Sequence, residues 1–83
     1  MTVKQWKARV AALGCLMCQQ PANLHHVREG QGLSQRSSDW LVVPLCRLHH
    51  QGTDGIHDGR RFYLRFKLDE LDLLAMTIEQ VSQ

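Results

Sequence analysis

The chain has 83 residues, 43% of them hydrophobic, with two prolines and a net charge of +2. This composition excludes a disordered chain, and no apolar run approaches the roughly 18 residues that span a bilayer. The N-terminus lacks the apolar segment of a signal peptide, so we expect a cytoplasmic protein. A single domain over residues 1–83 would bury only about 60–65% of its unfolded surface, so a structural metal would help to stabilise it.

Charge is distributed unevenly along the chain. Residues 1–67 contain all ten Lys and Arg against four acidic residues, which gives a net charge of +6. Residues 68–83 contain four acidic residues and no Lys or Arg, which gives −4. A basic body with an acidic last segment can bind a polyanion on one side only. An ordinary solvated surface has the same totals, so charge alone does not identify a nucleic-acid-binding protein.

The first expected element is a helix over residues 3–13. Thr2 and Gln5 form a capping-box pattern at its start, and Gly14 suits the position after its end. Its apolar residues recur at helical spacing: Val3, Trp6, Val10 and Leu13. This stripe is expected to face the core.

Two short strands follow in the expected order. The first covers residues 23–27, and the second covers residues 40–43 and ends at Pro44. A polar, glycine-rich loop over residues 30–39 joins them into an open hairpin.

Two helices are expected in the last third of the chain. One begins near Asp58 and covers residues 60–67. The other has Asp69 as its N-cap and Asp72 at the third helical position, and it runs to about Val81. Its apolar residues share one face: Leu71, Leu74, Ala75, Ile78 and Val81.

The spacing of the three cysteines indicates a zinc site. An odd number of cysteines suits a disulfide framework poorly. Cys15-x-x-Cys18 and Cys46-x-x-His49 instead form two matched ligand pairs about thirty residues apart. Structural zinc sites fill all four tetrahedral positions with Cys and His. The sequence therefore predicts a structural Zn²⁺ at these four residues, against the alternative of core thiols beside a surface histidine.

The other histidines suggest a second site: His25, His26, His50 and His57. Singly, each is more often an ordinary surface or core residue than a ligand. Together, a His pair on one strand and His50 directly after the second zinc-ligand pair describe a ββα unit with a metal at its centre. Neighbours on a strand point to opposite faces, so His25 and His26 are expected to have different roles.

Two segments resemble the HNH nucleases of the ββα-metal class: Leu24-His25-His26-Val27 and Val43-Pro44-Leu45-Cys46-Arg47-Leu48-His49-His50. More narrowly, residues 25–32, 35–39 and 44–50 are similar to the phage and prophage recombination-enhancement nucleases, the Ref family, which act with RecA. The likeness extends over about residues 13–75. It implies an α+β, zinc-stapled ββα-metal domain with an N-terminal helix and one or two C-terminal helices. It also implies hydrolysis of DNA phosphodiester bonds in phage or prophage recombination, with DNA and a RecA filament as partners.

The resemblance assigns roles by position. His25 and His50 match metal ligands, and His26 matches the general base. Mg²⁺ or another divalent ion would bind His25 and His50, with water and phosphate in the rest of its shell. The last ligand is either His57 or Asp54. We favour His57, because the glycines on either side of Asp54 disfavour a regular helical turn there.

One position departs from the family pattern. The family's Asn, which usually orients the base, falls at Leu41, and a leucine cannot hydrogen-bond an imidazole. Another group must then orient His26. The alternative function is a non-catalytic zinc module that binds DNA or a recombination protein, and a third is a purely structural zinc domain.

Four arginines are the candidates for contacts with DNA phosphates: Arg28, Arg36, Arg47 and Arg60. Contacts of this kind bind without reading sequence and weaken steeply with salt. Arg28 and Arg36 are the better candidates because they flank the proposed site, whereas Arg61 and Arg65 are expected to be solvated surface charges. We expect Trp40 in the core and not as a platform for base stacking.

Overall fold

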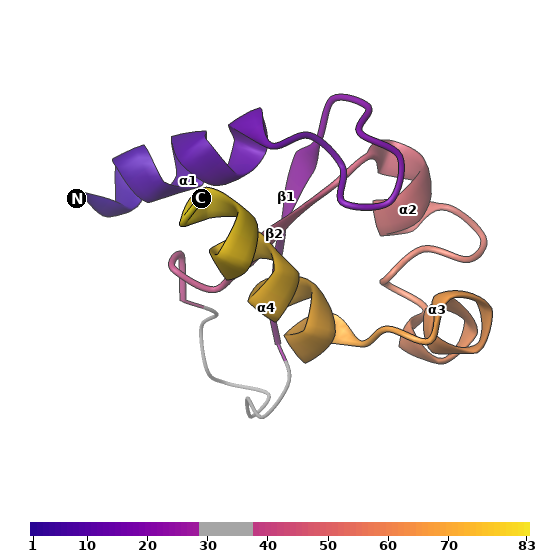
Figure 1. The fold of residues 1–83 in the computed structure, drawn as a ribbon. Helices are drawn as coiled ribbons and strands as arrows, with labels where there is room; N and C mark the ends of the chain where they lie inside the picture. The colour runs from indigo at the N-terminus through magenta and orange to yellow at the C-terminus, as the bar shows by residue number, and fades with distance from the viewer. Residues whose placement is uncertain (29–37) are drawn as a thin grey trace.

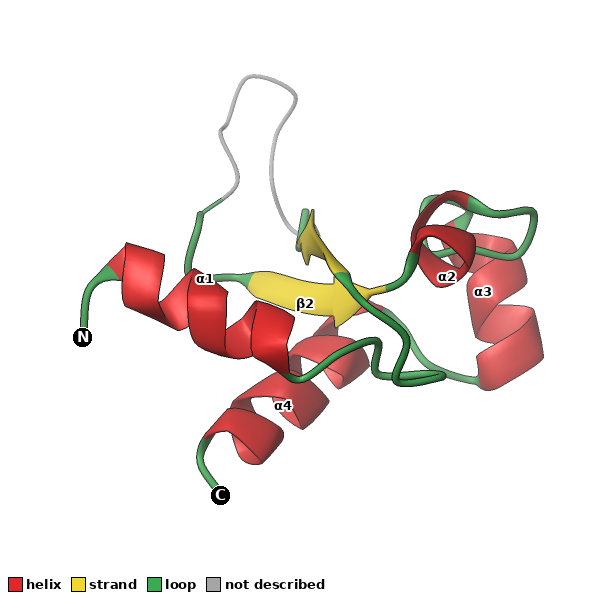
Figure 2. Ribbon diagram, turned by 90° about the horizontal axis from the view of Figure 1, so that it is seen from above, coloured by secondary structure: helices red, strands yellow, loops and turns green. Residues whose placement is uncertain are grey.

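A computed structural model describes residues 1–28 and 38–83 as an α+β fold built on a two-stranded antiparallel sheet. Figure 1 shows its elements in chain order: α1 (Val3–Ala12), β1 (Asn23–His26), β2 (Val42–Leu45), α2 (Arg47–Gln51), α3 (Gly59–Phe66) and α4 (Glu70–Val81). Helices α1 and α4 contact each other and the sheet, and α2 contacts both strands. Figure 2 shows α2 and α3 together at the end of the molecule opposite the N-terminus.

Helix α1 begins and ends as its sequence predicts. The Thr2 side chain accepts a hydrogen bond from the Gln5 amide, and the Gln5 side chain accepts one from the Thr2 amide. Gly14 after the helix has a φ of 76°, a left-handed conformation that favours glycine. Val10 is fully buried at the centre of the predicted apolar stripe.

The second strand of the sheet is shifted along the chain from its predicted position. Strand β2 covers Val42–Leu45 and includes Pro44, whereas the sequence predicts a strand over 40–43. A proline is tolerated because every strand of a two-stranded sheet is an edge, and the Pro44 carbonyl accepts a hydrogen bond from the Leu16 amide (3.1 Å). The prediction of Trp40 in the core is wrong. Trp40 is 46% exposed in the turn before β2, where its ring lies 6.3 Å from that of Trp6.

Helices α3 and α4 begin at the predicted aspartates. The Asp58 side chain accepts from the Arg61 amide (3.3 Å), and Asp69 and Asp72 form a complete capping box. Helix α3 ends at Lys67, which has a left-handed φ of 59°.

The apolar stripe predicted on α4 does not form its buried face. Leu71 and Ile78 from that stripe are about half exposed, whereas Leu73 and Thr77 are fully buried. The Thr77 hydroxyl donates to the Leu73 carbonyl (2.8 Å), so the helix can bury this polar side chain without leaving it unpaired.

One hydrophobic core joins the sheet to the helices. Its buried members come from β2, helices α3 and α4, and the connecting segments: Cys15, Val27, Val43, Leu45, Cys46, Ile56, Phe62 and Leu73. Because it includes Cys15 and Cys46, the core is continuous with the predicted zinc ligands. Within the described ranges, no helix combines the length and the apolar character needed to cross a membrane.

Candidate metal centres

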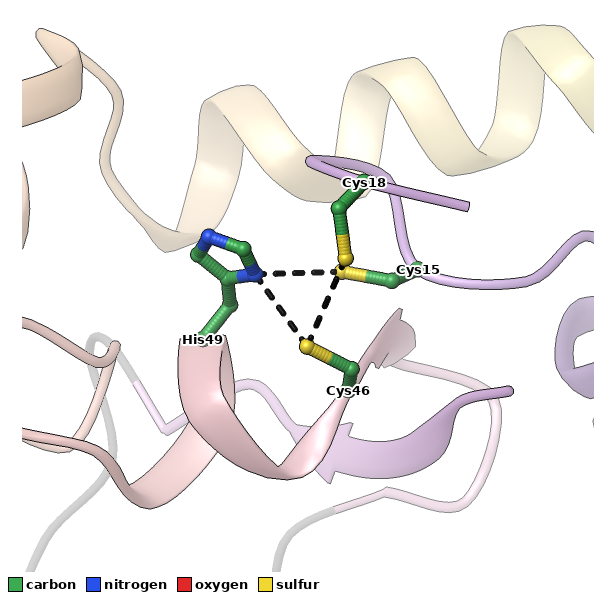
Figure 3. A group of neighbouring side chains, drawn as sticks. All are labelled: Cys15, Cys18, Cys46 and His49. Atoms are coloured by element: carbon green, nitrogen blue, oxygen red, sulfur yellow. Dashed lines mark hydrogen bonds between the residues drawn. The ribbon is translucent and has the colours of Figure 1, made fainter. Parts of the chain in front are cut away.

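The four predicted zinc ligands converge at one point between the first loop and α2 (Figure 3). Their ligand atoms all lie within 4.8 Å of one another. The sulfur atoms of Cys18 and Cys46 are 3.6 Å apart, and His49 Nδ1 lies 3.2 Å from Cys46 Sγ and 3.6 Å from Cys15 Sγ. Zn–S bonds of about 2.3 Å at tetrahedral angles put sulfur ligands about 3.8 Å apart. The set, hereafter the cysteine cluster, can therefore hold a zinc ion.

Local backbone geometry builds each half of the cysteine cluster. After α1 the chain turns tightly, with the Cys15 amide bonded to the Gln20 carbonyl and the Gln19 amide to the Cys15 carbonyl, both at 2.8 Å. Cys46 is the N-cap of α2, and His49 lies in the first turn of that helix. The Phe66 ring in the last turn of α3 packs edge-on against the His49 ring, with the ring centroids 5.6 Å apart.

Electrostatics favour the zinc-binding form of Cys46. Burial raises the pKa of its thiol, but the backbone amide and ring of His49 and the two neighbouring thiols lower the pKa further, to about 6. The thiolate is the form that binds metal, so Cys46 is suited to zinc at neutral pH.

The second group consists of His25, His50 and His57, hereafter the histidine cluster. His50 Nε2 lies 3.1 Å from His25 Nδ1 and 2.9 Å from His57 Nε2. Burial and the charges of the other two rings lower the pKa of His50 to about 4. Burial also lowers the pKa of His25, against an opposing effect of Glu70. Both shifts favour neutral imidazole, which is the metal-binding form.

Each histidine of this cluster comes from a different element. His25 is on β1, His50 is on α2, and His57 is in the loop that leads to α3. The loop folds back closely on α2: a Cβ added to Gly55 would lie only 2.8 Å from the backbone carbonyl of His50. Asp54, the other residue left open for the last ligand position, instead accepts a hydrogen bond from Arg65 (3.3 Å) and lies outside the cluster.

Two carboxylates for which the sequence predicts no role contact the paired histidines of β1. His25 Nε2 donates to Glu70 Oε2 in the first turn of α4 (2.5 Å). His26 points to the other face of the strand, as predicted, and its Nε2 lies 2.8 Å from Asp39 Oδ1. Asp39 thus makes a hydrogen bond to the His26 imidazole of a kind that Leu41 cannot make.

An open cleft of about 460 Å³ borders the histidine cluster, and its walls include His25, His57 and Glu70. Arg28 lines the same cleft. Arg47 lies in a separate hollow beside Leu48, Gln51 and Gly52, and Arg60 is exposed on α3. The proposed DNA contact at Arg36 lies outside the described residues.

Three imidazole nitrogens suit some metals better than others. Imidazole is a good ligand for Zn²⁺, Ni²⁺, Co²⁺ and Fe²⁺, whereas Mg²⁺ prefers oxygen ligands. The histidine cluster therefore fits a transition-metal ion, and it fits Mg²⁺ poorly. No protein-family model matches this chain, and neither does any curated protein or solved structure.

Proposed function

We propose that the protein is a metal-dependent endonuclease of the HNH type that hydrolyses DNA phosphodiester bonds. In this proposal the cysteine cluster holds a structural zinc ion and the histidine cluster holds a catalytic divalent ion. The observation that carries the proposal is the three-histidine cluster beside an open cleft, with an arginine in the cleft wall. A catalytic metal site has fewer protein ligands than a structural one, because substrate and water need the remaining positions.

The cleft supports a phosphodiester as the substrate. Arg28 brings a permanent positive charge to the wall that His25 and His57 also line. A guanidinium binds phosphate oxygens with its fork of N–H donors. A contact to the backbone does not read base sequence, so we expect cleavage without strong sequence preference and binding that weakens with salt.

The proposed general base is His26, which follows the metal-ligand candidate His25 directly in the chain. With its Nε2 engaged by Asp39, the Nδ1 atom of His26 is left to accept a proton from the attacking water. Asp39 would fix the tautomer and stabilise the imidazolium that forms, as a carboxylate does in a Ser-His-Asp triad. A bound divalent ion would supply positive charge for the developing phosphorane and the departing oxyanion.

A nicking assay on supercoiled plasmid tests this proposal. The zinc-loaded protein is incubated with Mn²⁺, Co²⁺, Ni²⁺ or Mg²⁺, beside His26→Ala and the control Asn23→Ala from the exposed start of the same strand. We expect nicking that needs the added ion, is weakest with Mg²⁺, and falls about 10²–10⁴-fold in His26→Ala alone. Full activity in His26→Ala would remove this residue from the mechanism.

The biological setting we propose is phage or prophage recombination, with a RecA filament as partner. The same assay on single-stranded DNA, with and without a RecA filament, tests this part separately. If the folded, zinc-loaded protein cuts none of these substrates but binds DNA in a salt-dependent manner, the non-catalytic zinc module is the better description.

A further inference from the structure

We propose that Glu70 is a positioning residue for the histidine cluster: its carboxylate holds the His25 ring so that Nδ1 is presented to a metal ion shared with His50 and His57. This inference rests on the second metal site of the proposed function, though not on its nuclease activity. It also gives the C-terminal helix α4 a part in the metal site, beyond its packing against the sheet.

The contacts of the His25 ring place Glu70 behind the metal ligand. His25 Nε2 donates to Glu70 Oε2, and Nδ1 on the other side of the ring lies 3.1 Å from His50 Nε2. A proton held on Nε2 leaves the lone pair of Nδ1 directed at the cluster. Metal-binding histidines in proteins almost always donate their other ring N–H to a carboxylate, a carbonyl or water, which fixes the tautomer and raises ligand basicity.

The Glu70 carboxylate is itself held in place. Both of its oxygens lie 3.3 Å from the Arg28 amide, just beyond the end of β1. Glu70 is the first residue of α4, and the capping box of Asp69 and Asp72 fixes the start of this helix. Leu73, three residues further on, is fully buried in the core. The carboxylate is therefore fixed by both the strand and the helix, as a positioning group must be.

The other two histidines do not have this support. The buried Nδ1 of His50 has no hydrogen-bond partner among the residues that the structure describes, and His57 is exposed. No carboxylate contact to either ring is found within residues 1–28 and 38–83. Among the described residues, Glu70 is thus the carboxylate on which the ring orientation in the histidine cluster depends.

Titration of the zinc-loaded protein with Co²⁺ tests the inference, because cobalt bound by histidines gives a visible d–d spectrum. The variant is Glu70→Gln, which keeps the side-chain shape and removes the charge. The matched control is Glu79→Gln, the same change at an exposed position of the same helix. We expect the Co²⁺ dissociation constant to rise about 10–100-fold in Glu70→Gln and to stay unchanged in Glu79→Gln, with zinc content and thermal unfolding unaltered.

A second measurement reads the tautomer of His25 directly. Nitrogen-15 NMR of the zinc-loaded protein before addition of cobalt reports which ring nitrogen of His25 carries the proton. We expect the Nε2–H tautomer in the wild type and a mixture of tautomers in Glu70→Gln. A wild-type Nδ1–H tautomer, equal Co²⁺ affinity of Glu70→Gln and wild type, or no Co²⁺ binding by the wild type would each overturn the inference. Cobalt binding that depends on Glu70, without any DNA cleavage, would uphold it and contradict the nuclease proposal.

Discussion

The two clusters share one short helix and differ in nearly every other respect. Helix α2 supplies adjacent histidines to both, with His49 in the cysteine cluster and His50 in the histidine cluster. Four side chains make up the cysteine cluster, whereas three make up the histidine cluster, which borders an open cleft. A closed set of ligands suits a structural ion and an open set suits a catalytic one. Neighbouring residues on one helix can therefore serve sites of different kinds.

The metal-binding forms of the two clusters also differ in charge. The pKa of the Cys46 thiol falls to about 6, after the effect of burial is overcome by the amide and ring of His49, so the sulfur becomes an anion. Burial and neighbouring rings lower the pKa of His50 to about 4, so the imidazole stays uncharged. Anionic sulfur favours Zn²⁺, whereas neutral nitrogen ligands do not reduce the positive charge of a bound ion.

Removal of zinc is expected to have the largest effect, because it should disrupt both clusters. Structural zinc contributes about 10–16 kcal/mol in small zinc domains, which is as large as or larger than the net stability of a typical chain of this size. Chelation, or Cys46→Ser, should therefore unfold the protein and eliminate both clusters, because Cys46 is a candidate zinc ligand directly before the helix that bears His50. Circular dichroism and Co²⁺ binding follow the two losses, and added zinc should restore both in the chelated wild type. A chelated protein that keeps its fold would contradict a structural role for the cysteine cluster.

A smaller change should damage the histidine cluster alone. Gly55→Ala would place a methyl group 2.8 Å from the His50 backbone, so the loop that bears His57 must move. We expect the free energy of unfolding to fall by about 1–3 kcal/mol. The Co²⁺ dissociation constant should rise about tenfold or more, while zinc is retained.

The matched control is Gly59→Ala, where an added Cβ meets no atom within 4 Å. Chemical denaturation and Co²⁺ titration compare the two variants. Equal Co²⁺ affinity in both would mean that the close approach of the loop at Gly55 does not position the third histidine.

The smallest expected effect is on acid stability. Because the folded-state pKa of His50 is about 4 and an unfolded histidine titrates near 6.5, the unfolded chain takes up a proton first as the pH falls. The stabilising contribution is complete above about pH 6.5 and is lost as the pH falls from there towards 4. Histidine NMR on the zinc-loaded protein checks this: His50 should still be neutral at pH 5.5. Titration of His50 near pH 6.5 would instead show that its ring in the histidine cluster is exposed to solvent.

Local sequence patterns predicted what depends on neighbours in the chain. The helix caps at Thr2 and Asp69 and the helix start near Asp58 are confirmed, because each depends on residues only a few positions apart. The predicted zinc ligands come together because each pair is a local turn or helix start, and only the meeting of the pairs depends on the fold.

The contacts that escaped prediction depend on the packing of distant segments. Glu70 and His25 are 45 residues apart, and an acidic residue in the first turn of a helix already has a local explanation. Asp39 and His26 meet only because the hairpin register pairs His26 with Val42. The buried face of α4 was missed for a similar reason. Periodicity reveals an apolar stripe, but the side facing the core also depends on whether a polar residue such as Thr77 can bond to its own helix.

Whether one chain holds two ions of different kinds can be measured with a metal count by equilibrium dialysis. The zinc-loaded wild type, His57→Ala and the control His26→Ala are dialysed against Co²⁺, and both metals are then measured per chain. We expect one zinc in all three proteins, and one cobalt in the wild type and His26→Ala but little in His57→Ala. A wild type that holds zinc alone, or a His57→Ala variant that binds cobalt as well as the wild type, would contradict the second site.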